Sequence, residues 1–164
     1  MVFFETGAGG SVPKHVQQLV GENHLRWDSL GEFCALGESL NFLAEAKDMP
    51  KAAILGDAVD AATQKLLENG NSPERKVGQN DNRTSHYYFA RYWADALAQS
   101  GDAELAAHFA PIAKALVENE SQILAELLAG GGEAVDLDGY FRTDEAKTRS
   151  VMRPSATLNA IIEP

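Results

Sequence analysis

A glycine-rich turn close to the N-terminus combines residue types that could hold a phosphate group. Residues 7–10 (Gly-Ala-Gly-Gly) follow an apolar run, and Ser11 then opens a helix start that carries Lys14 and His15. Glycines allow a ligand to approach the backbone, while the free amides and the dipole of a helix start favour an anion. The spacing matches neither the dinucleotide fingerprint nor the P-loop. An ordinary strand-to-helix turn with Ser11 as its N-cap is therefore an equal alternative.

Composition favours one soluble globular domain. The chain has 164 residues, of which 45% are hydrophobic and 23% are charged. Its formal net charge of −10 repels polyanions, so nucleic acid is excluded as a bulk partner, and local clusters of basic residues stand out as specific anion sites. No apolar stretch approaches the length of a membrane span, and no secretory signal is recognisable. We therefore expect a cytoplasmic protein without a membrane partner.

The elements that must position these residues are mostly helical. A short buried strand is expected at 2–5. Residues 135–138, where apolar and acidic residues alternate, are expected to form either a short edge strand or an extended loop. Periodicity and capping signals predict helices elsewhere: from Ser11 to Gly21, from Ser29 to about Ala46, from about Lys51 to Glu68, from His86 to Gln99, along 102–129 and over 156–161 after Ser155. The predicted fold is mainly α with one or two short strands.

Several local predictions accompany these helices. Ser29 and Glu32 have the spacing of a capping box, and Pro111 should bend or split the segment 102–129. The single cysteine, Cys34, excludes an internal disulfide and has the helical spacing of a small buried residue. Residues 130–132 (Gly-Gly-Gly) should stop a helix. The polar loop 72–83 is too long for a simple turn, which makes it a candidate functional loop.

A series of specific motifs is distributed along the chain. They are Phe-Glu-Thr-Gly-Ala-Gly-Gly-Ser at 4–11, Pro-Lys-His-Val-Gln-Gln at 13–18, Leu-Arg-Trp-Asp-Ser-Leu-Gly-Glu-Phe at 25–33, Ser-Pro-Glu-Arg-Lys-Val-Gly at 72–78, Asp-Asn-Arg at 81–83 with Ser-His at 85–86, Tyr-Trp-Ala at 92–94 and Met-Arg-Pro-Ser-Ala-Thr-Leu-Asn-Ala at 152–160. With these motifs the chain resembles the monomeric-type NADP-dependent isocitrate dehydrogenases of bacteria. The resemblance covers essentially the whole chain but only the C-terminal section of the longer family polypeptide. It implies that residues 1–164 form one C-terminal, cofactor-binding segment of an isocitrate/isopropylmalate dehydrogenase-like α/β domain.

The resemblance also implies roles for individual residues. Gly10 and Ser11 match the turn that approaches the cofactor, and His15 matches a ligand of its adenosine-phosphate end. Arg26 and Arg75 match two guanidinium contacts to the 2′-phosphate of NADP. Planar guanidinium groups suit that role because they meet phosphate oxygens bidentately.

Other positions keep a structural interpretation beside the functional one. Asp28 matches a family contact, yet an acid at a helix start also interacts favourably with the helix dipole. Residues 81–86, including Arg83 and His86, are interpreted as a loop and cap, with Thr84 standing where the family usually has glycine. The acidic pairs Asp57/Asp60 and Asp136/Asp138 are interpreted as solvated surface.

The functional expectation is an oxidoreductase segment that binds NADP without supplying a catalytic residue or a metal ligand. By resemblance, the complete enzyme converts isocitrate to 2-oxoglutarate, and its Mg²⁺ or Mn²⁺ and its substrate are held by residues upstream of this segment. The isolated chain should then be inactive, with the N-terminal remainder of the enzyme as its partner. Self-association is also expected, because the apolar strand at 2–5 would be unpaired. The alternatives are a stand-alone helical module that binds a nucleotide or a protein, and a purely structural helical domain.

Overall fold

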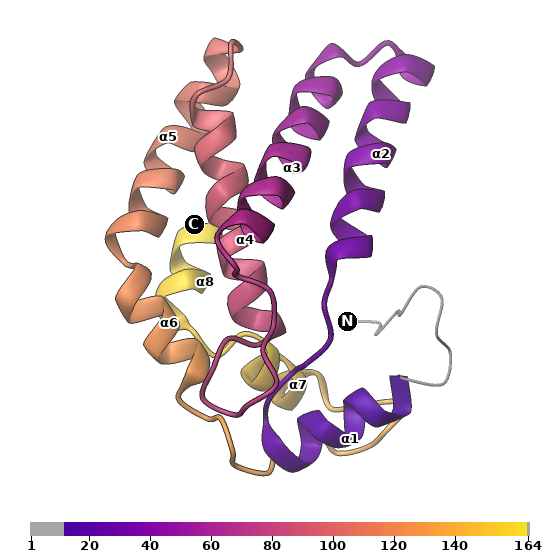
Figure 1. Cartoon of the computed structure of the whole chain (residues 1–164), viewed down its shortest axis with the longest axis vertical. Coiled ribbons are helices and arrows are strands. Elements are labelled where there is room, and N and C mark those ends of the chain that lie inside the picture. Colours follow the sequence, from indigo (N-terminus) through magenta and orange to yellow (C-terminus); the bar gives the residue numbers. More distant parts are fainter. Residues whose placement is uncertain (1–11, 164) are drawn as a thin grey trace.

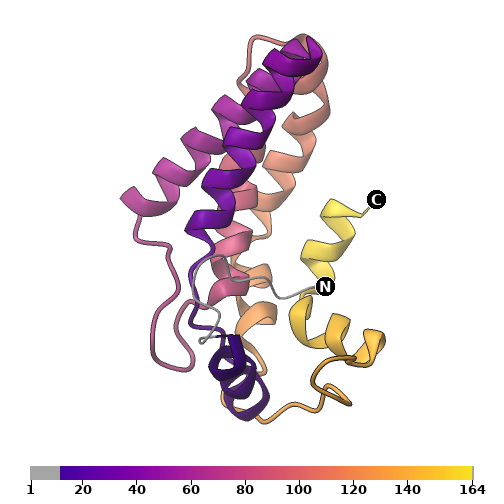
Figure 2. The same ribbon diagram turned by 90° about the vertical axis from the view of Figure 1, so that its right-hand side faces the viewer.

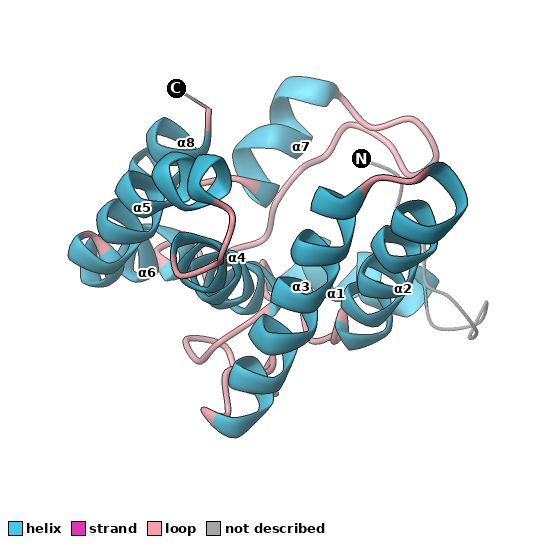
Figure 3. Ribbon diagram, turned by 90° about the horizontal axis from the view of Figure 1, so that it is seen from above, coloured by secondary structure: helices cyan, strands magenta, loops and turns pink. Residues whose placement is uncertain are grey.

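The computed structural model describes residues 12–163, and in this range the chain forms eight helices joined by loops, with no strand. Seen from above, the described elements are all helix or loop (Figure 3). The helices are α1 (Val12–Glu22), α2 (Leu30–Lys47), α3 (Pro50–Glu68), α4 (Asn82–Ala98), α5 (Ala103–Glu118), α6 (Glu120–Leu128), α7 (Glu145–Met152) and α8 (Ala156–Ile162).

Four long helices form the body of the molecule. Helix α2 packs on α3, α3 on α4, and α4 on α5, with α1 lying near the lower end of this row (Figure 1). The long connection 69–81 between α3 and α4 descends beside α1 (Figure 2). The buried residues gather in three clusters: Phe33, Val59, Ala62, Leu66, Phe89 and Tyr92; Tyr87, Ala94, Ala113, Leu116, Ile123 and Leu127; and Leu19, Leu25 and Leu137.

Helix α4 starts at a buried cap. The Asp81 carboxylate accepts hydrogen bonds from the backbone amides of Arg83 and Thr84, while the Thr84 hydroxyl accepts one from the amide of Asp81. This reciprocal arrangement is a capping box, and both side chains that make it are fully buried. The predicted cap is confirmed at Asp81 and Thr84, whereas residues 82–86 form the first turn of α4 and are not a loop. Thr84 serves as a cap partner here.

Arg83 extends that cap into a buried network. Its guanidinium pairs with Asp81 and also donates to the side chain and backbone carbonyl of Asn23 and to the carbonyl of Val151. Each of the five N–H donors of an arginine side chain therefore has an acceptor. Because Asn23 belongs to the link after α1 and Val151 to α7, one side chain ties both segments to the start of α4.

A carboxylate on α6 fixes the last helix. Glu126 accepts hydrogen bonds from the hydroxyls of Ser155 and Thr157 and from the Thr157 amide, and Ser155 caps α8 through the Leu158 amide. The predicted cap at Ser155 is confirmed. Together with a hydrogen bond from Gln122, these donors stabilise the ionised form and lower the pKa of Glu126 to about 2.

Of the two predicted strands, only the one at 135–138 lies in the described part of the chain, and it is not formed. Residues 135–138 are irregular: the Val135 amide donates to Val20 on α1 and the Leu137 side chain is buried, so single contacts replace a ladder. The alternation there reflects one buried side chain beside two exposed acids, Asp136 and Asp138. The strand predicted at 2–5 lies outside the described residues, and the α/β domain stays a prediction.

Three local predictions are wrong for identifiable reasons. Ser29 makes no side-chain cap; the Asp28 carboxylate accepts from the Leu30 amide instead. Pro111 lies within α5 on an exposed side, and the break between α5 and α6 falls at Asn119. Cys34 is exposed, because its face of α2 has no neighbouring helix among the described residues.

The helix predicted from His86 begins earlier, at Asn82, because the Asp81 cap opens α4 there. The glycine stop at 130–132 is confirmed: α6 ends at Leu128, and Gly132 beyond it has a positive φ of 92°. Sequence analysis missed α7, whose eight residues carry little apolar periodicity. Among the helices described for 12–163, none has both the length and the apolar content required to cross a membrane.

The buried network yields a stability prediction. Arg83→Met leaves the Asp81 carboxylate buried without its cation, so we expect the free energy of unfolding to fall by about 3–5 kcal/mol. Lys65→Met, which breaks the half-exposed ion pair with Asp95, should cost less than about 1 kcal/mol. Urea unfolding followed by circular dichroism measures both variants. Equal losses in the two would contradict a structural role for the Arg83 network.

The depressed pKa of Glu126 predicts a pH dependence. Its stabilising contribution is complete above the ordinary glutamate pKa of 4.5 and is lost as the pH falls toward about 2. Glu126→Gln should therefore lower the melting temperature at pH 7, and the difference from the wild type should shrink as the pH falls below 4. Glu45→Gln, at an exposed position of α2, is the matched control. A difference that stays constant from pH 7 to pH 3 would show that the charge of Glu126 is not responsible.

Candidate functional site

The link 23–29 between α1 and α2 is held firmly against the start of α4. The Leu25 carbonyl accepts from the Asn82 amide at 2.8 Å, and the Trp27 carbonyl accepts from the Asn82 side chain at 3.1 Å. The Leu25 amide in turn faces the Asp81 carboxylate at 3.4 Å. Since these contacts use backbone atoms of the link, they set its path whatever side chain stands at position 26.

The loop 74–80 is closed upon itself and lies beside this link. The Glu74 amide donates to the Asn80 carbonyl at 2.8 Å, and the Asn80 amide donates to the Glu74 carboxylate at 3.2 Å. A turn from Lys76 to Gln79, in which Gly78 has a positive φ of 85°, reverses the chain. The functional-loop candidate is therefore an ordered structure that presents Arg75 on one arm.

The structure brings the two predicted phosphate ligands together. The Nε atom of Arg26 donates to the backbone carbonyl of Arg75 at 2.7 Å, although the two residues are 49 positions apart. The Nη1 atom of Arg26 also pairs with Glu22, one helical turn earlier. Two of the three guanidinium nitrogens of Arg26 thus point at protein partners, and the side chain is held in one orientation.

His15 and Asp28 border the same link. The His15 ring lies 5.3 Å from the Trp27 ring between centroids, which places α1 next to residues 26–28. Asp28 is exposed, and one of its carboxylate oxygens accepts from the Leu30 amide at 3.0 Å. Its role at the helix start is therefore observed, while a cofactor contact stays a prediction. Gly10 and Ser11 lie outside the described residues.

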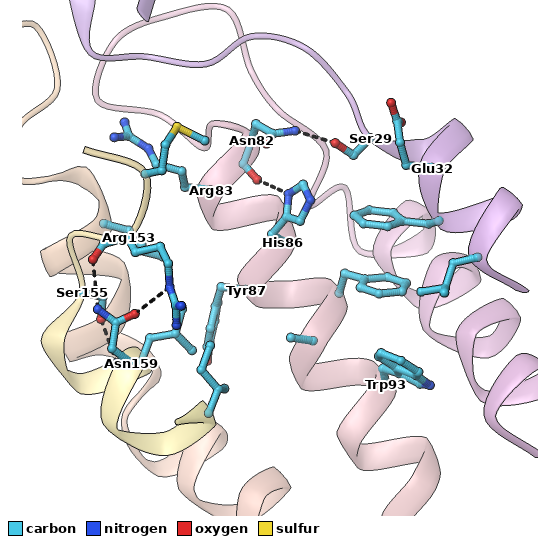
Figure 4. Close-up of a pocket in the computed structure, with 18 of the residues that line it drawn as sticks. Ser29, Glu32, Asn82, Arg83, His86, Tyr87, Trp93, Arg153, Ser155 and Asn159 are labelled. Atoms are coloured by element: carbon cyan, nitrogen blue, oxygen red, sulfur yellow. Dashed lines mark hydrogen bonds between the residues drawn. The ribbon is translucent and has the colours of Figure 1, made fainter. Parts of the chain in front are cut away.

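A cavity of about 570 Å³ adjoins the site on the other side of the link. Its walls come from α2, α4, α6, α8 and the residues before α8 (Figure 4). Trp27 and Ser29 belong to its lining, as do the exposed His86 and the partly buried Arg153 and Asn159. The apolar part of the wall includes Phe33, Leu36, Phe89, Trp93, Leu127, Leu158 and Ile162.

Polar groups at one end of this cavity are mostly paired with one another. The Nδ1 atom of His86 forms a hydrogen bond with the backbone carbonyl of Asn82 at 2.8 Å, and the side-chain amide of Asn82 donates to the Ser29 hydroxyl (Figure 4). Arg153 donates from Nε to Asn159 at 3.1 Å and pairs with Glu163. The cavity is consequently an apolar pocket whose polar rim is mostly paired, with Nη2 of Arg153 buried and without a hydrogen-bond partner. Sequence analysis did not predict it, because its walls come from helices distant in the chain.

Comparison with known proteins shows which protein family the chain belongs to. The family model of monomeric isocitrate dehydrogenase matches residues 2–163. The chain belongs to the monomeric isocitrate dehydrogenase family. It is 57% identical over 160 residues to "Isocitrate dehydrogenase [NADP] 2" of Psychrobacter sp. (strain 13A) and 56% identical over 162 residues to "Isocitrate dehydrogenase [NADP]" of Azotobacter vinelandii. These alignments cover 97% and 98% of this chain, but the chain spans only 22% of the length of either relative.

Within this member of the isocitrate dehydrogenase family, the described residues suit an anion better than a cation. In the part of the chain that the structure describes, neither Nη2 of Arg26 nor the guanidinium of the exposed Arg75 makes a hydrogen bond or ion pair. These donors can therefore meet the oxygens of a phosphate ester. Between residues 12 and 163, no group of three or more His, Cys, Asp or Glu residues is arranged to hold a metal ion.

Sequence analysis missed two neighbours of the arginines. Glu22 pairs with Arg26, and the buried His24 contacts the carbonyl of Glu74, the residue before Arg75. Position 24 carries no periodic or motif signal of its own. Only the crossing of the link with the loop 74–80 shows what its imidazole contacts.

Proposed function

We propose that this chain supplies the contacts to the 2′-phosphate of NADP in an isocitrate dehydrogenase. The observation that carries the proposal is the hydrogen bond from Arg26 to the backbone of Arg75, which joins the two cationic residues in one site. His15 lies against the same link, and Gly10 and Ser11 are assigned to the adjoining approach of the cofactor by the family resemblance. The name of the relatives, which includes NADP, supports this choice of cofactor.

The chemistry of the proposed site would favour NADP over NAD. A hydrogen bond to a charged group contributes about 1.5–3 kcal/mol. Two arginines on one phosphate would then favour NADP by roughly 3–6 kcal/mol, which corresponds to about a hundredfold to ten-thousandfold in affinity. The overall negative charge of the chain opposes anion binding, so recognition depends on these local donors.

The proposed reaction is the oxidative decarboxylation of isocitrate to 2-oxoglutarate. When bound, NADP accepts the hydride from C2 of isocitrate. The residues of this chain bind and orient the adenosine end of the cofactor and provide no acid, base or metal ligand. Mg²⁺ or Mn²⁺ is assigned to the remainder of the enzyme, in keeping with the donor set of the described residues. We place the enzyme in the cytoplasm.

The remainder of the enzyme polypeptide is the proposed partner of this chain. The chain spans 22% of its relatives, and the cavity between α2, α4 and α8 presents an apolar wall that a further segment could cover. Self-association through residues 2–4 stays a prediction, because those residues lie outside the described part. Sedimentation at high protein concentration tests it directly.

The alternative is a stand-alone helical module that binds a nucleotide or a protein without catalysis. The closed loop 74–80 and the cavity, each built within this chain, are the observations that favour it. Selective binding of a 2′-phosphate is compatible with both proposals. Binding of adenine nucleotides irrespective of the 2′-phosphate would favour the module over the dehydrogenase segment.

Substitution of either arginine should weaken recognition of the 2′-phosphate. Arg26→Ala and Arg75→Ala are each expected to reduce affinity for 2′,5′-ADP by about tenfold to a hundredfold, from the loss of charged hydrogen bonds. Calorimetry with this chain measures the effect, and the same variants in the full-length enzyme should raise KM for NADP far more than KM for isocitrate. Lys47→Ala is the control. It also removes one positive charge, but Lys47 lies at the far end of α2, about 27 Å along the helix from Leu30, which is next to the site. Unchanged affinity in both arginine variants would refute the assignment.

The isolated chain is expected to turn over no isocitrate. The physical reason is that the groups for hydride transfer and metal binding are assigned to the rest of the polypeptide. The assay monitors NADPH absorbance with isocitrate, NADP and Mg²⁺ or Mn²⁺, with the full-length enzyme as the positive control. Activity of the isolated chain above the buffer rate would overturn this division of roles.

A further inference from the structure

Two successive carbonyls of the loop 74–80 are held by alternate side chains of the link after α1. The Nε2 atom of His24 lies 2.9 Å from the carbonyl oxygen of Glu74, and Nε of Arg26 lies 2.7 Å from that of Arg75. His24 is 1% exposed, whereas Arg26 is partly exposed at the edge of the site. The buried imidazole and the partly exposed guanidinium therefore form a two-point clamp on the backbone at Glu74 and Arg75.

We propose that His24 is a positioning residue for recognition of the cofactor phosphate, acting through the backbone that carries Arg75. This inference rests on the proposed function. The carbonyl oxygen can only accept, so Nε2 of His24 must carry a proton and donate it. His24 touches no ligand in this role. It fixes the point from which the Arg75 side chain extends.

The need for such a residue follows from the construction of the loop. Loop 74–80 is closed by its own hydrogen bonds, and hydrogen bonds from His24 and Arg26 join it to the link. Within the described residues the Arg75 guanidinium has no hydrogen-bonding or ionic partner, so its backbone sets the point from which the side chain extends. Hydrogen bonds to two successive carbonyls fix the orientation of the loop at this point better than the Arg26 bond alone.

The link from which His24 projects is itself held in place by hydrogen bonds at Asn23. The Asn23 side chain donates to the Gly130 carbonyl at 3.0 Å, and Arg83 donates to both the side chain and the backbone carbonyl of Asn23. The backbone from which His24 projects is thus fixed to α4 and to the end of α6. His24 transmits this rigidity to the exposed loop.

The test compares two replacements of His24 in this chain. His24→Leu keeps an apolar side chain of similar bulk but removes the donor. His24→Gln keeps an N–H donor at nearly the reach of Nε2. His108→Leu, at an exposed position on α5, controls for the loss of an imidazole. Affinities for 2′,5′-ADP and 5′-AMP are measured by calorimetry at a temperature where circular dichroism shows each variant folded.

We expect His24→Leu to weaken 2′,5′-ADP binding roughly threefold to tenfold, the effect of one neutral hydrogen bond, with 5′-AMP affinity within about twofold of the wild type. His24→Gln should recover most of the lost affinity, and ¹⁵N NMR of the wild type should show a protonated Nε2 on His24. Equal losses of affinity for 2′,5′-ADP and 5′-AMP would show that His24 acts only as a buried core residue. A glutamine variant that binds 2′,5′-ADP as weakly as the leucine variant would show the same.

The same experiment separates this inference from the function on which it rests. Failure of the wild-type chain to bind 2′,5′-ADP overturns the proposed phosphate site and the clamp with it. Wild-type binding that is lost in Arg75→Ala but unchanged in His24→Leu overturns only the positioning role. Selective loss in both variants supports the two together.

Discussion

The buried pair of Asp81 and Arg83 is the interaction on which the arrangement of this molecule depends. Burying two charges carries a large desolvation cost, and that cost is offset only where every donor and acceptor is satisfied. Asp81 meets this condition by capping α4, and Arg83 meets it by donating to Asn23 and Val151. The requirement to satisfy one guanidinium therefore fixes three separate segments at the base of α4.

The candidate site is a consequence of that arrangement. The link after α1 crosses the start of α4, and the loop before α4 returns beside it, so residues near positions 25 and 75 become neighbours. Rigid backbone behind an exposed arginine is valuable in anion recognition, because less side-chain and loop entropy is lost on binding. The capping network therefore also supports the backbone of the candidate phosphate site.

The cavity between α2, α4 and α8 shows a different constraint. Helix α8 has only seven residues and is too short to be stable alone, so it depends on Glu126 and Ser155 for its place. Its separation from α2 leaves Phe33, Phe89 and Trp93 lining an open pocket. An apolar surface of this kind suits coverage by another polypeptide segment.

Sequence alone determined the helical character, most helix positions and the cap at Ser155, because these depend on the local pattern of residues. It also determined the family of the chain, because long family motifs can be read directly from the sequence. It failed for Cys34, Ser29 and residues 135–138, where the outcome depends on which neighbour covers a face or occupies a cap. The contacts of Arg26 with Arg75 and of His24 with Glu74 were decided only by tertiary structure. Both join residues about fifty positions apart through backbone carbonyls, and every residue type carries the same carbonyl, so no side-chain pattern encodes such a contact.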